Sequence, residues 1–172
     1  MKATTLEMFR EELLRTGAYA TPPGRMAPTP RAPGALTTFG LCWSTFSVFP
    51  LCAVYEALGR LTTDMWAHFC FRSARKAERY GVPLIAEGWN NRRDYKGPVV
   101  YLANHMSTLE TILLPFVLLG YGPFCTVVKA SLAHLPFLEK AAAHMGLIPI
   151  GRTNPREDLM TIFNVGGERI AQ

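Results

Sequence analysis

The sequence lacks the cysteine spacing of a zinc site or of a disulfide framework. Its cysteines stand far apart among apolar residues, and no two of them form a C-x-x-C pair. They are Cys42, Cys52, Cys70 and Cys125. Small buried thiols are the default interpretation of such residues, so we expect neither a metal site nor disulfides. A reducing compartment would fit this pattern.

The chain also lacks the charge density of a nucleic-acid-binding protein. Eighteen lysines and arginines against thirteen acidic residues give a formal charge of +5 over 172 residues, which is modest and scattered. Basic residues are densest between residues 72 and 96, at Arg72, Arg75, Lys76, Arg79, Arg92, Arg93 and Lys96. An anionic membrane surface or an anionic substrate would suit this basic stretch. A solvated helix face is an equally good interpretation.

A continuous apolar core is absent from the first sixteen residues, so no secretory signal is recognisable there. Glu7, Glu11 and Glu12 instead indicate a short amphipathic helix. Residues 21–34 hold five prolines. Because proline lacks the amide donor of a helix and restricts the residue before it, these residues predict a linker. We therefore assign residues 1–34 to an amphipathic helix and a proline-rich linker.

Charge is absent from residues 35–55. These twenty-one residues are long enough for a bilayer, which takes about 20 residues, but serines, threonines and Pro50 interrupt the apolar pattern. We expect this segment to lie in one leaflet rather than to span the membrane, with a buried helix of a soluble protein as the alternative. A second helix over residues 61–80, capped by Thr63 or Asp64, would complete a membrane-associated hairpin over residues 35–80.

Residues 81–172 predict part of an α/β domain organised around residues 98–120. The apolar run at residues 99–103 predicts a strand, and Asn104 and His105 follow it in a turn. Ligands of open α/β sheets bind at the carboxyl ends of strands. The sequence then predicts a helix over residues 108–119, a strand over 124–129 parallel to the first, a helix over 136–145, a strand over 147–150 and a last helix capped by Asn154.

His105 and Glu110 are the candidate catalytic pair. Positions five apart lie about 140° from each other on a continuous helix, but a histidine in the turn can meet a glutamate in the first helical turn. Histidine suits a general base because its unperturbed pKa is about 6.5, and a carboxylate can fix the tautomer of its ring. Ser107 and Glu110 also form a capping box, so a structural cap and a structural turn histidine are the alternatives. His134 and Glu139 have the same spacing without a preceding strand.

Residues 104–110, NHMSTLE, resemble the N-H-x-S-x-x-D block of the glycerolipid acyltransferases, whose best-known members are the lysophosphatidic acid (1-acylglycerol-3-phosphate) acyltransferases. Two further blocks follow in the order of that family. The block around Lys129, KASL followed by Pro136, resembles its K-x-E-L block. The block ending at Arg152, GLIPIGR, resembles its G-x-I-x-x-x-R block. The resemblance covers residues 98–172.

Three features depart from the pattern of this family. Glu110 stands where the family usually has aspartate, and Ser131 stands where it commonly has glutamate. The sequence also ends at Gln172, before an F-P-E-G-T-R-like block that in the family helps to hold the substrate phosphate. We therefore expect an acyltransferase domain that is incomplete at its C-terminal end.

The resemblance implies transfer of a fatty acyl group from acyl-CoA or acyl carrier protein to the 2-hydroxyl of lysophosphatidic acid, which makes phosphatidic acid in phospholipid synthesis. His105 would be the general base and Glu110 its orienting carboxylate. The acyl donor would be a substrate, with no metal and no bound cofactor. The lipid acceptor implies a membrane partner, and we expect the cytoplasmic face of the inner membrane and no nucleic acid. A related acyltransferase acting on another lysolipid or aminolipid, and an inactive membrane-binding fragment, are the alternatives.

The resemblance also implies residues that bind the substrate. Arg152 would bind the phosphate, since a planar guanidinium matches that group, whereas a surface arginine is the alternative. Lys129 would face either the phosphate or water. Asn104 and Ser107 are further substrate-binding candidates that fit equally well a role in shaping the turn alone.

Overall fold

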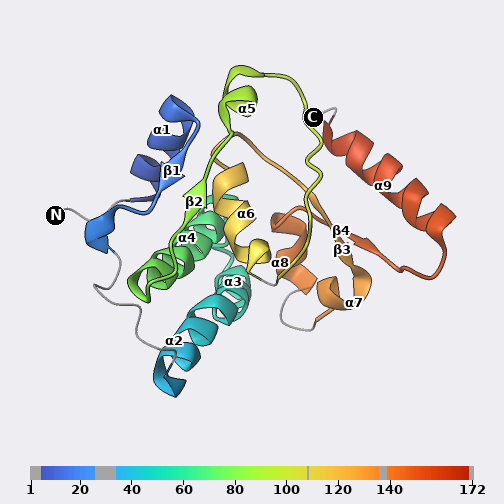
Figure 1. The fold of residues 1–172 in the computed structure, drawn as a ribbon. Helices are drawn as coiled ribbons and strands as arrows, with labels where there is room; N and C mark the ends of the chain where they lie inside the picture. The colour runs from blue at the N-terminus through green and yellow to red at the C-terminus, as the bar shows by residue number, and fades with distance from the viewer. Residues whose placement is uncertain (1–4, 26–33, 108, 136–138, 171–172) are drawn as a thin grey trace. The chain divides into compact units, whose positions relative to one another are not determined.

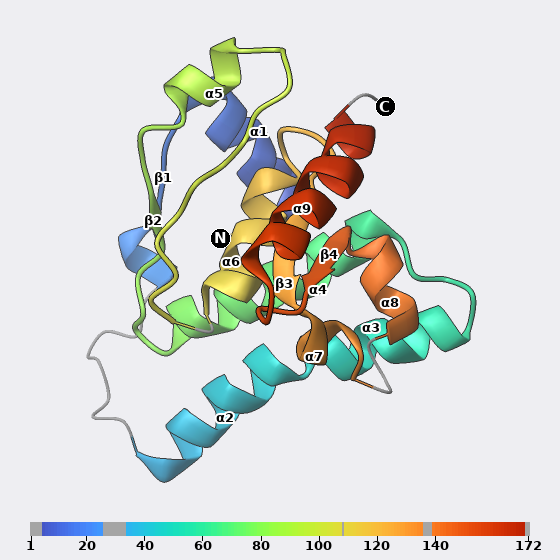
Figure 2. The same ribbon diagram turned by 90° about the vertical axis from the view of Figure 1, so that its right-hand side faces the viewer.

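The computed structural model describes residues 5–25, 34–107, 109–135 and 139–170 (Figures 1 and 2). It is a mixed, helix-rich α/β protein, and its described strands form two sheets of two strands each. The chain separates into two compact units. The first comprises Met1–Val48 and Ala67–Gly122, and the second comprises Phe49–Trp66 and Pro123–Gln172.

Phe9 is the centre of an aromatic core in the first unit. It lies in α1 (Leu6–Thr16), the predicted amphipathic helix, and its side chain is fully buried. The centroid of its ring lies 4.8 Å from that of Tyr19, 5.5 Å from that of Phe71 and 5.2 Å from that of Phe116. Aromatic pairs at such separations add to the stability that area burial gives. One face of α1 thus packs against side chains from three other elements of this unit.

The first unit also contains short elements that the sequence did not predict. Tyr19 belongs to β1 (Tyr19–Ala20), which pairs antiparallel with β2 (Ile85–Ala86), and α5 (Asn90–Asp94) follows in the region assigned to a connection. A 3₁₀ helix also covers Pro23–Arg25 in the predicted linker. Such short elements carry too few residues to show a periodicity.

The basic stretch is partly internal to the first unit. Glu78 of α4 (Thr63–Arg79) is only 1% exposed, and its carboxylate accepts hydrogen bonds from the Tyr19 hydroxyl (2.8 Å) and the Thr21 hydroxyl (2.6 Å). The guanidinium of Arg75 pairs with the same carboxylate. Because a buried charge is costly unless it is paired and hydrogen-bonded, Arg75 serves the fold here. The predicted second helix is confirmed, but its cap is Thr62, whose hydroxyl accepts from the N–H of Met65, rather than Thr63 or Asp64.

The apolar segment forms two consecutive helices, α2 (Ala35–Phe46) and α3 (Val48–Ala57). The break at Ser47 follows from Pro50, because proline has no N–H to donate to the carbonyl four residues earlier, that of Phe46. Taken together, Ala35–Ala57 are long and apolar enough to cross a membrane, by length and composition alone, and 17% of that window is buried. The exposed large apolar side chains of α2 are Leu36, Phe39, Trp43 and Phe46.

The predicted strand at residues 99–103 is absent from the structure. The segment runs through the first unit without pairing with any described strand, and Val100 and Leu102 are 74% and 95% exposed. A strand is defined by ladder hydrogen bonds to a neighbour, which an apolar run by itself does not provide. The helix that follows is confirmed, as α6 (Glu110–Leu118), but the predicted strand–helix–strand unit with its parallel crossover is not formed by these residues.

The second unit contains a parallel pair of strands with a helix against it. β3 (Thr126–Lys129) and β4 (Leu147–Ile150) pair in register, with Lys129 opposite Ile150. α9 (Pro155–Ile170) lies across β4, as Figure 2 shows. The short helices between the strands are α7 (Ala130–Ala133) and α8 (Glu139–His144). Both strands and the last helix are confirmed, whereas Pro136, the predicted start of α8, lies outside the described residues.

The cysteines follow the prediction only in part. Cys52 and Cys70 are buried and Cys125 is half-buried, but Cys42 is exposed. Cys42 lies on α2, whose apolar character had indicated burial although most of that helix faces outward.

Candidate active site

The turn that carries His105 is held by the carboxylate of Glu110, the first residue of α6. Both carboxylate oxygens accept from the N–H of Met106, at 3.0 and 2.9 Å, and from the N–H of Ser107, at 3.1 Å each. The Ser107 hydroxyl accepts from the N–H of Leu109 at 3.2 Å. Glu110 therefore acts as the predicted cap toward Ser107.

The same carboxylate also binds the ring of His105. The distance from His105 Nδ1 to Glu110 Oε2 is 2.7 Å. Because an ionised carboxylate can only accept, Nδ1 carries the proton of this hydrogen bond, and in the neutral ring Nε2 keeps its lone pair. The His105 side chain is 73% exposed, so Nε2 is open to an incoming hydroxyl group. The structure thus brings together the two residues that the sequence paired, in a geometry that suits a general base.

The charge of Glu110 is stabilised by its partners. The N–H of Ser107 is the largest cause that lowers the pKa of this carboxyl below its ordinary value, followed by the His105 ring and the N–H of Met106. Hydrogen bonds to the charged form favour that form. The carboxylate is therefore ionised at neutral pH, as an orienting group for an imidazolium must be.

Two other histidines have carboxylate neighbours. His134 Nδ1 lies 3.6 Å from Glu139 Oε1, too far for a hydrogen bond, with both side chains more than half exposed. His144 Nδ1 lies 3.1 Å from Glu56 Oε2 in the second unit, a pairing that its sequence neighbours did not indicate. Among the described residues, no three His, Cys, Asp or Glu side chains gather in a way that could hold a metal ion.

Lys129 and Arg152 lie at the same edge of the parallel pair in the second unit. Lys129 ends β3, and Arg152 follows β4 by two residues, so both stand at carboxyl ends of neighbouring parallel strands. Both side chains are exposed. Arg152 adopts a positive φ of 61°, and its N–H donates to Asp158, a residue that the sequence motifs do not single out. His105 and Glu110 belong to the first unit, whereas Lys129 and Arg152 belong to the second.

Asn104 and Ser107 stay close to the turn itself. Asn104 is exposed, and no hydrogen bond joins its side chain to another residue in the described part of the chain. Ser107 uses its hydroxyl for the backbone of Leu109. Ser107 therefore has a role in shaping the turn.

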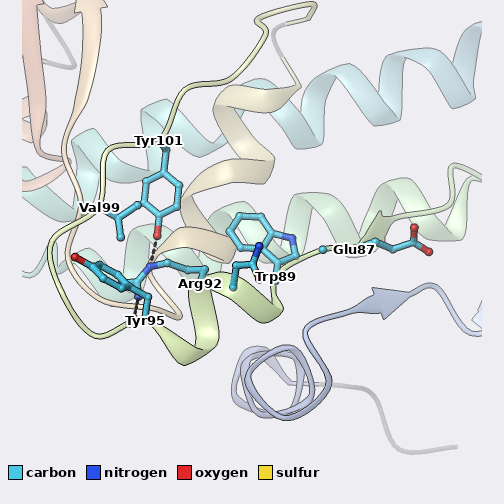
Figure 3. A pocket seen from close by; sticks show the side chains of 8 residues that line it. Glu87, Trp89, Arg92, Tyr95, Val99 and Tyr101 are labelled. Carbon is cyan, nitrogen blue, oxygen red and sulfur yellow. Dashed lines mark hydrogen bonds between the residues drawn. The ribbon is translucent and has the colours of Figure 1, made fainter.

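A cavity of about 450 Å³ opens in the first unit beside the chain that leads to His105 (Figure 3). Its walls include Trp89, Arg92, Tyr95 and Tyr101. The guanidinium of Arg92 donates from Nε to the Tyr101 hydroxyl (2.5 Å) and from its two Nη atoms to the carbonyls of Tyr95 (2.6 Å) and Tyr121 (3.1 Å). Arg92, predicted only as part of the basic stretch, thus binds three separate points of the backbone and side chains around this cavity.

Comparisons with known proteins show the family to which the chain is related. A family model described as acyltransferase matches residues 71–165. The chain is similar to a protein of Pseudomonas aeruginosa (strain PAO1) named 1-acyl-sn-glycerol-3-phosphate acyltransferase, with 29% identity over 136 residues. That alignment covers 77% of this chain and 49% of the relative, so the chain spans about half the length of the curated relative it matches. No solved structure matches the chain.

The pKa of Glu110 makes a prediction for the stability of the turn. The pKa is lower in the folded state than the value of about 4.3 in an unfolded chain. Ionisation of Glu110 therefore stabilises the turn above that pH, and the stabilisation is lost as the pH falls through the folded-state pKa. We expect an NMR titration of the Glu110 carboxyl carbon to have its midpoint below that of free glutamate. In His105→Ala the midpoint should stay low, because the Ser107 N–H is the larger cause; a return to the ordinary value would contradict this order.

Proposed function

Since the chain belongs to the glycerolipid acyltransferase family, we propose that it transfers a fatty acyl group from acyl-CoA or acyl carrier protein to the 2-hydroxyl of lysophosphatidic acid. The observation that carries the proposal is the 2.7 Å hydrogen bond from His105 Nδ1 to Glu110 Oε2. It leaves Nε2 as an exposed base beside a fixed carboxylate. The product would be phosphatidic acid, an intermediate of phospholipid synthesis.

The proposed reaction needs no nucleophile from the protein. As the hydroxyl oxygen of the acceptor attacks the thioester carbonyl, Nε2 of His105 takes the hydroxyl proton, and the Glu110 carboxylate stabilises the imidazolium that forms. The tetrahedral intermediate then collapses, the carbon–sulfur bond breaks, and the leaving thiolate takes the proton from Nε2. The histidine is neutral again at the end of the cycle.

A phosphate on the acceptor would bind Arg152 and Lys129. Two positive charges at one edge of a sheet suit a dianionic group, and arginine offers it two parallel N–H donors. The relative from Pseudomonas aeruginosa is named for a phosphate-bearing acceptor of this kind. Competition between lysophosphatidic acid and other lysolipids or aminolipids would separate this acceptor from the alternatives.

The acceptor also motivates a membrane location, which we propose to be one leaflet at the cytoplasmic face of the inner membrane. Drawing a long acyl chain into water costs about 0.8 kcal/mol per CH₂, so a site at the interface avoids that cost. The outward-facing large apolar side chains of α2 support an interfacial anchor, because they recur every three or four residues along one helix and three of them, Phe39, Trp43 and Phe46, are aromatic. The break at Ser47 favours an interfacial segment over a single straight span.

The role of His105 as base is tested against a matched histidine. His105→Ala should lower acyl transfer by about 10²–10⁴-fold, as loss of a general base does, in an assay with acyl-CoA and lysophosphatidic acid. His134 has the same five-residue spacing to a glutamate, Glu139, and His134→Ala should leave the rate nearly unchanged. Equal losses in the two variants would refute the assignment.

Glu110 is tested by removing its charge and keeping its shape. In Glu110→Gln one oxygen still accepts from the N–H of Ser107, so the thermal midpoint should change little. The neutral amide cannot stabilise an imidazolium, so turnover should fall by roughly 10²-fold. Glu139→Gln, at the glutamate next to His134, is the matched control and should leave turnover nearly unchanged. Full turnover in Glu110→Gln would leave Glu110 with the capping role alone.

The membrane anchor is tested by placing charge on its exposed face. Phe39→Glu combined with Trp43→Glu should move the protein from the membrane fraction to the soluble fraction with an unchanged circular dichroism spectrum, because both side chains face outward, at 66% and 63% exposed. Phe163→Glu on α9 is the control, since Phe163 is 64% exposed but lies outside the apolar segment. Release by the control to the same extent, or retention of the double variant, would contradict the proposed anchor.

A further inference from the structure

Arg152 has an unusual backbone conformation. Among the residues that the structure describes, it is the non-glycine residue with a positive φ, 61°. The left-handed region disfavours residues that carry a Cβ, and arginine has no short side chain that could relieve the crowding by a local hydrogen bond. Such a conformation persists where surrounding contacts hold it, and it is commonly found at functional sites.

Asp158 supplies the contacts that hold this conformation. Its Oδ1 accepts from the N–H of Gly151 at 2.9 Å, and its Oδ2 accepts from the N–H of Arg152 at 2.9 Å. Asp158 lies in the first turn of α9, where the helix dipole favours a negative charge. The two bonds fix two consecutive peptide groups in the connection between β4 and α9. Glu157, the residue before Asp158, has a different partner: its Oε1 accepts from the side-chain amide of Asn154 at 2.7 Å.

The conformation at Arg152 decides where its side chain points. A residue in the left-handed region directs its Cβ to a different side of the chain than an extended residue does. The guanidinium is exposed, and no hydrogen bond joins it to another residue in the described part of the chain. Lys129 stands at the end of the neighbouring strand, opposite Ile150. Asp158 therefore binds the backbone from which the Arg152 side chain leaves, at the edge of the sheet where Lys129 ends β3.

We propose that Asp158 is the positioning residue of the acceptor-phosphate site, because its carboxylate holds Arg152 in the left-handed conformation that presents the guanidinium to the phosphate. This inference rests on the proposed function, in which Arg152 and Lys129 bind that phosphate. Asp158 itself does not touch the substrate. It acts on acceptor binding through Arg152 and leaves the chemistry at His105 unaffected.

The first test is structural and independent of turnover. In Asp158→Asn only one oxygen accepts and the charge is lost, so the amide resonances of Gly151 and Arg152 should shift, and the backbone carbon shifts of Arg152 should leave the left-handed range. Glu157→Gln is the matched control in the same helical turn, and it keeps an oxygen for Asn154. Wild-type shifts at Arg152 in Asp158→Asn would overturn the inference, whatever the activity of the protein.

The second test separates binding from chemistry. Asp158→Asn should raise KM for lysophosphatidic acid on the order of tenfold, a loss of about 1.4 kcal/mol, with kcat nearly unchanged. Monoacylglycerol, which has no phosphate, should be used equally well by Asp158→Asn and by the wild type. Glu157→Gln should leave both parameters as they are. A residue that only caps α9 would lower stability without this selective change in KM.

A double-mutant cycle shows whether Asp158 acts through Arg152. Adding Asp158→Asn to Arg152→Ala should cause no further rise in KM, since the guanidinium to be positioned is gone. Additive effects would overturn the inference. If Arg152→Ala raises KM and Asp158→Asn does not, the positioning role fails while the phosphate site stands. If neither variant alters KM, the phosphate assignment of the proposed function fails and the inference falls with it.

Discussion

The Glu110 carboxylate is the group on which the geometry around His105 depends. It accepts from two consecutive backbone N–H groups and from the histidine ring, and so it joins the start of α6 to an exposed turn. A carboxylate offers about four lone-pair positions, which is enough for a helix cap and a ring partner at once. Glutamate is one methylene longer than the aspartate usual in the family, and here its carboxylate reaches back from the first residue of α6 to the N–H groups of Met106 and Ser107. Capping and orienting the histidine are therefore two consequences of one set of bonds.

Features that depend on neighbouring residues in the chain could be predicted from the sequence. Asn154 caps α9 as predicted, with its side-chain oxygen accepting from the N–H of Arg156, and β4 lies where its apolar run indicated. The approach of His105 to Glu110 followed from placing one in a turn and the other in a helical turn. Each of these rests on dihedral preferences and hydrogen bonds that span a few residues.

Features that depend on distant partners could not be predicted. An apolar run at residues 99–103 is compatible with a strand, but the strand needs a neighbour that the described part of the chain does not supply. The pairing of His144 with Glu56 joins residues far apart in sequence, and no spacing rule indicates it. The burial of Glu78 under Tyr19 and Thr21 is of the same kind. Asp158 is different, because an acidic residue in the first turn of a predicted helix is a recognisable signal that was available in the sequence.

Arg92 gives the region around His105 a closed connectivity. Its guanidinium binds Tyr101, which precedes the turn (Figure 3), and it also binds the carbonyl of Tyr121, which follows α6. Residues 101–121, which include the turn and α6, therefore form a loop whose two ends both hydrogen-bond to the guanidinium of Arg92. Holding the two ends of a loop together lowers the number of conformations that the chain between them can adopt. Lysine offers a single nitrogen where arginine offers a rigid fork of donors, so this set of three hydrogen bonds requires an arginine. The turn that carries His105 is therefore ordered in part by a residue outside the turn itself.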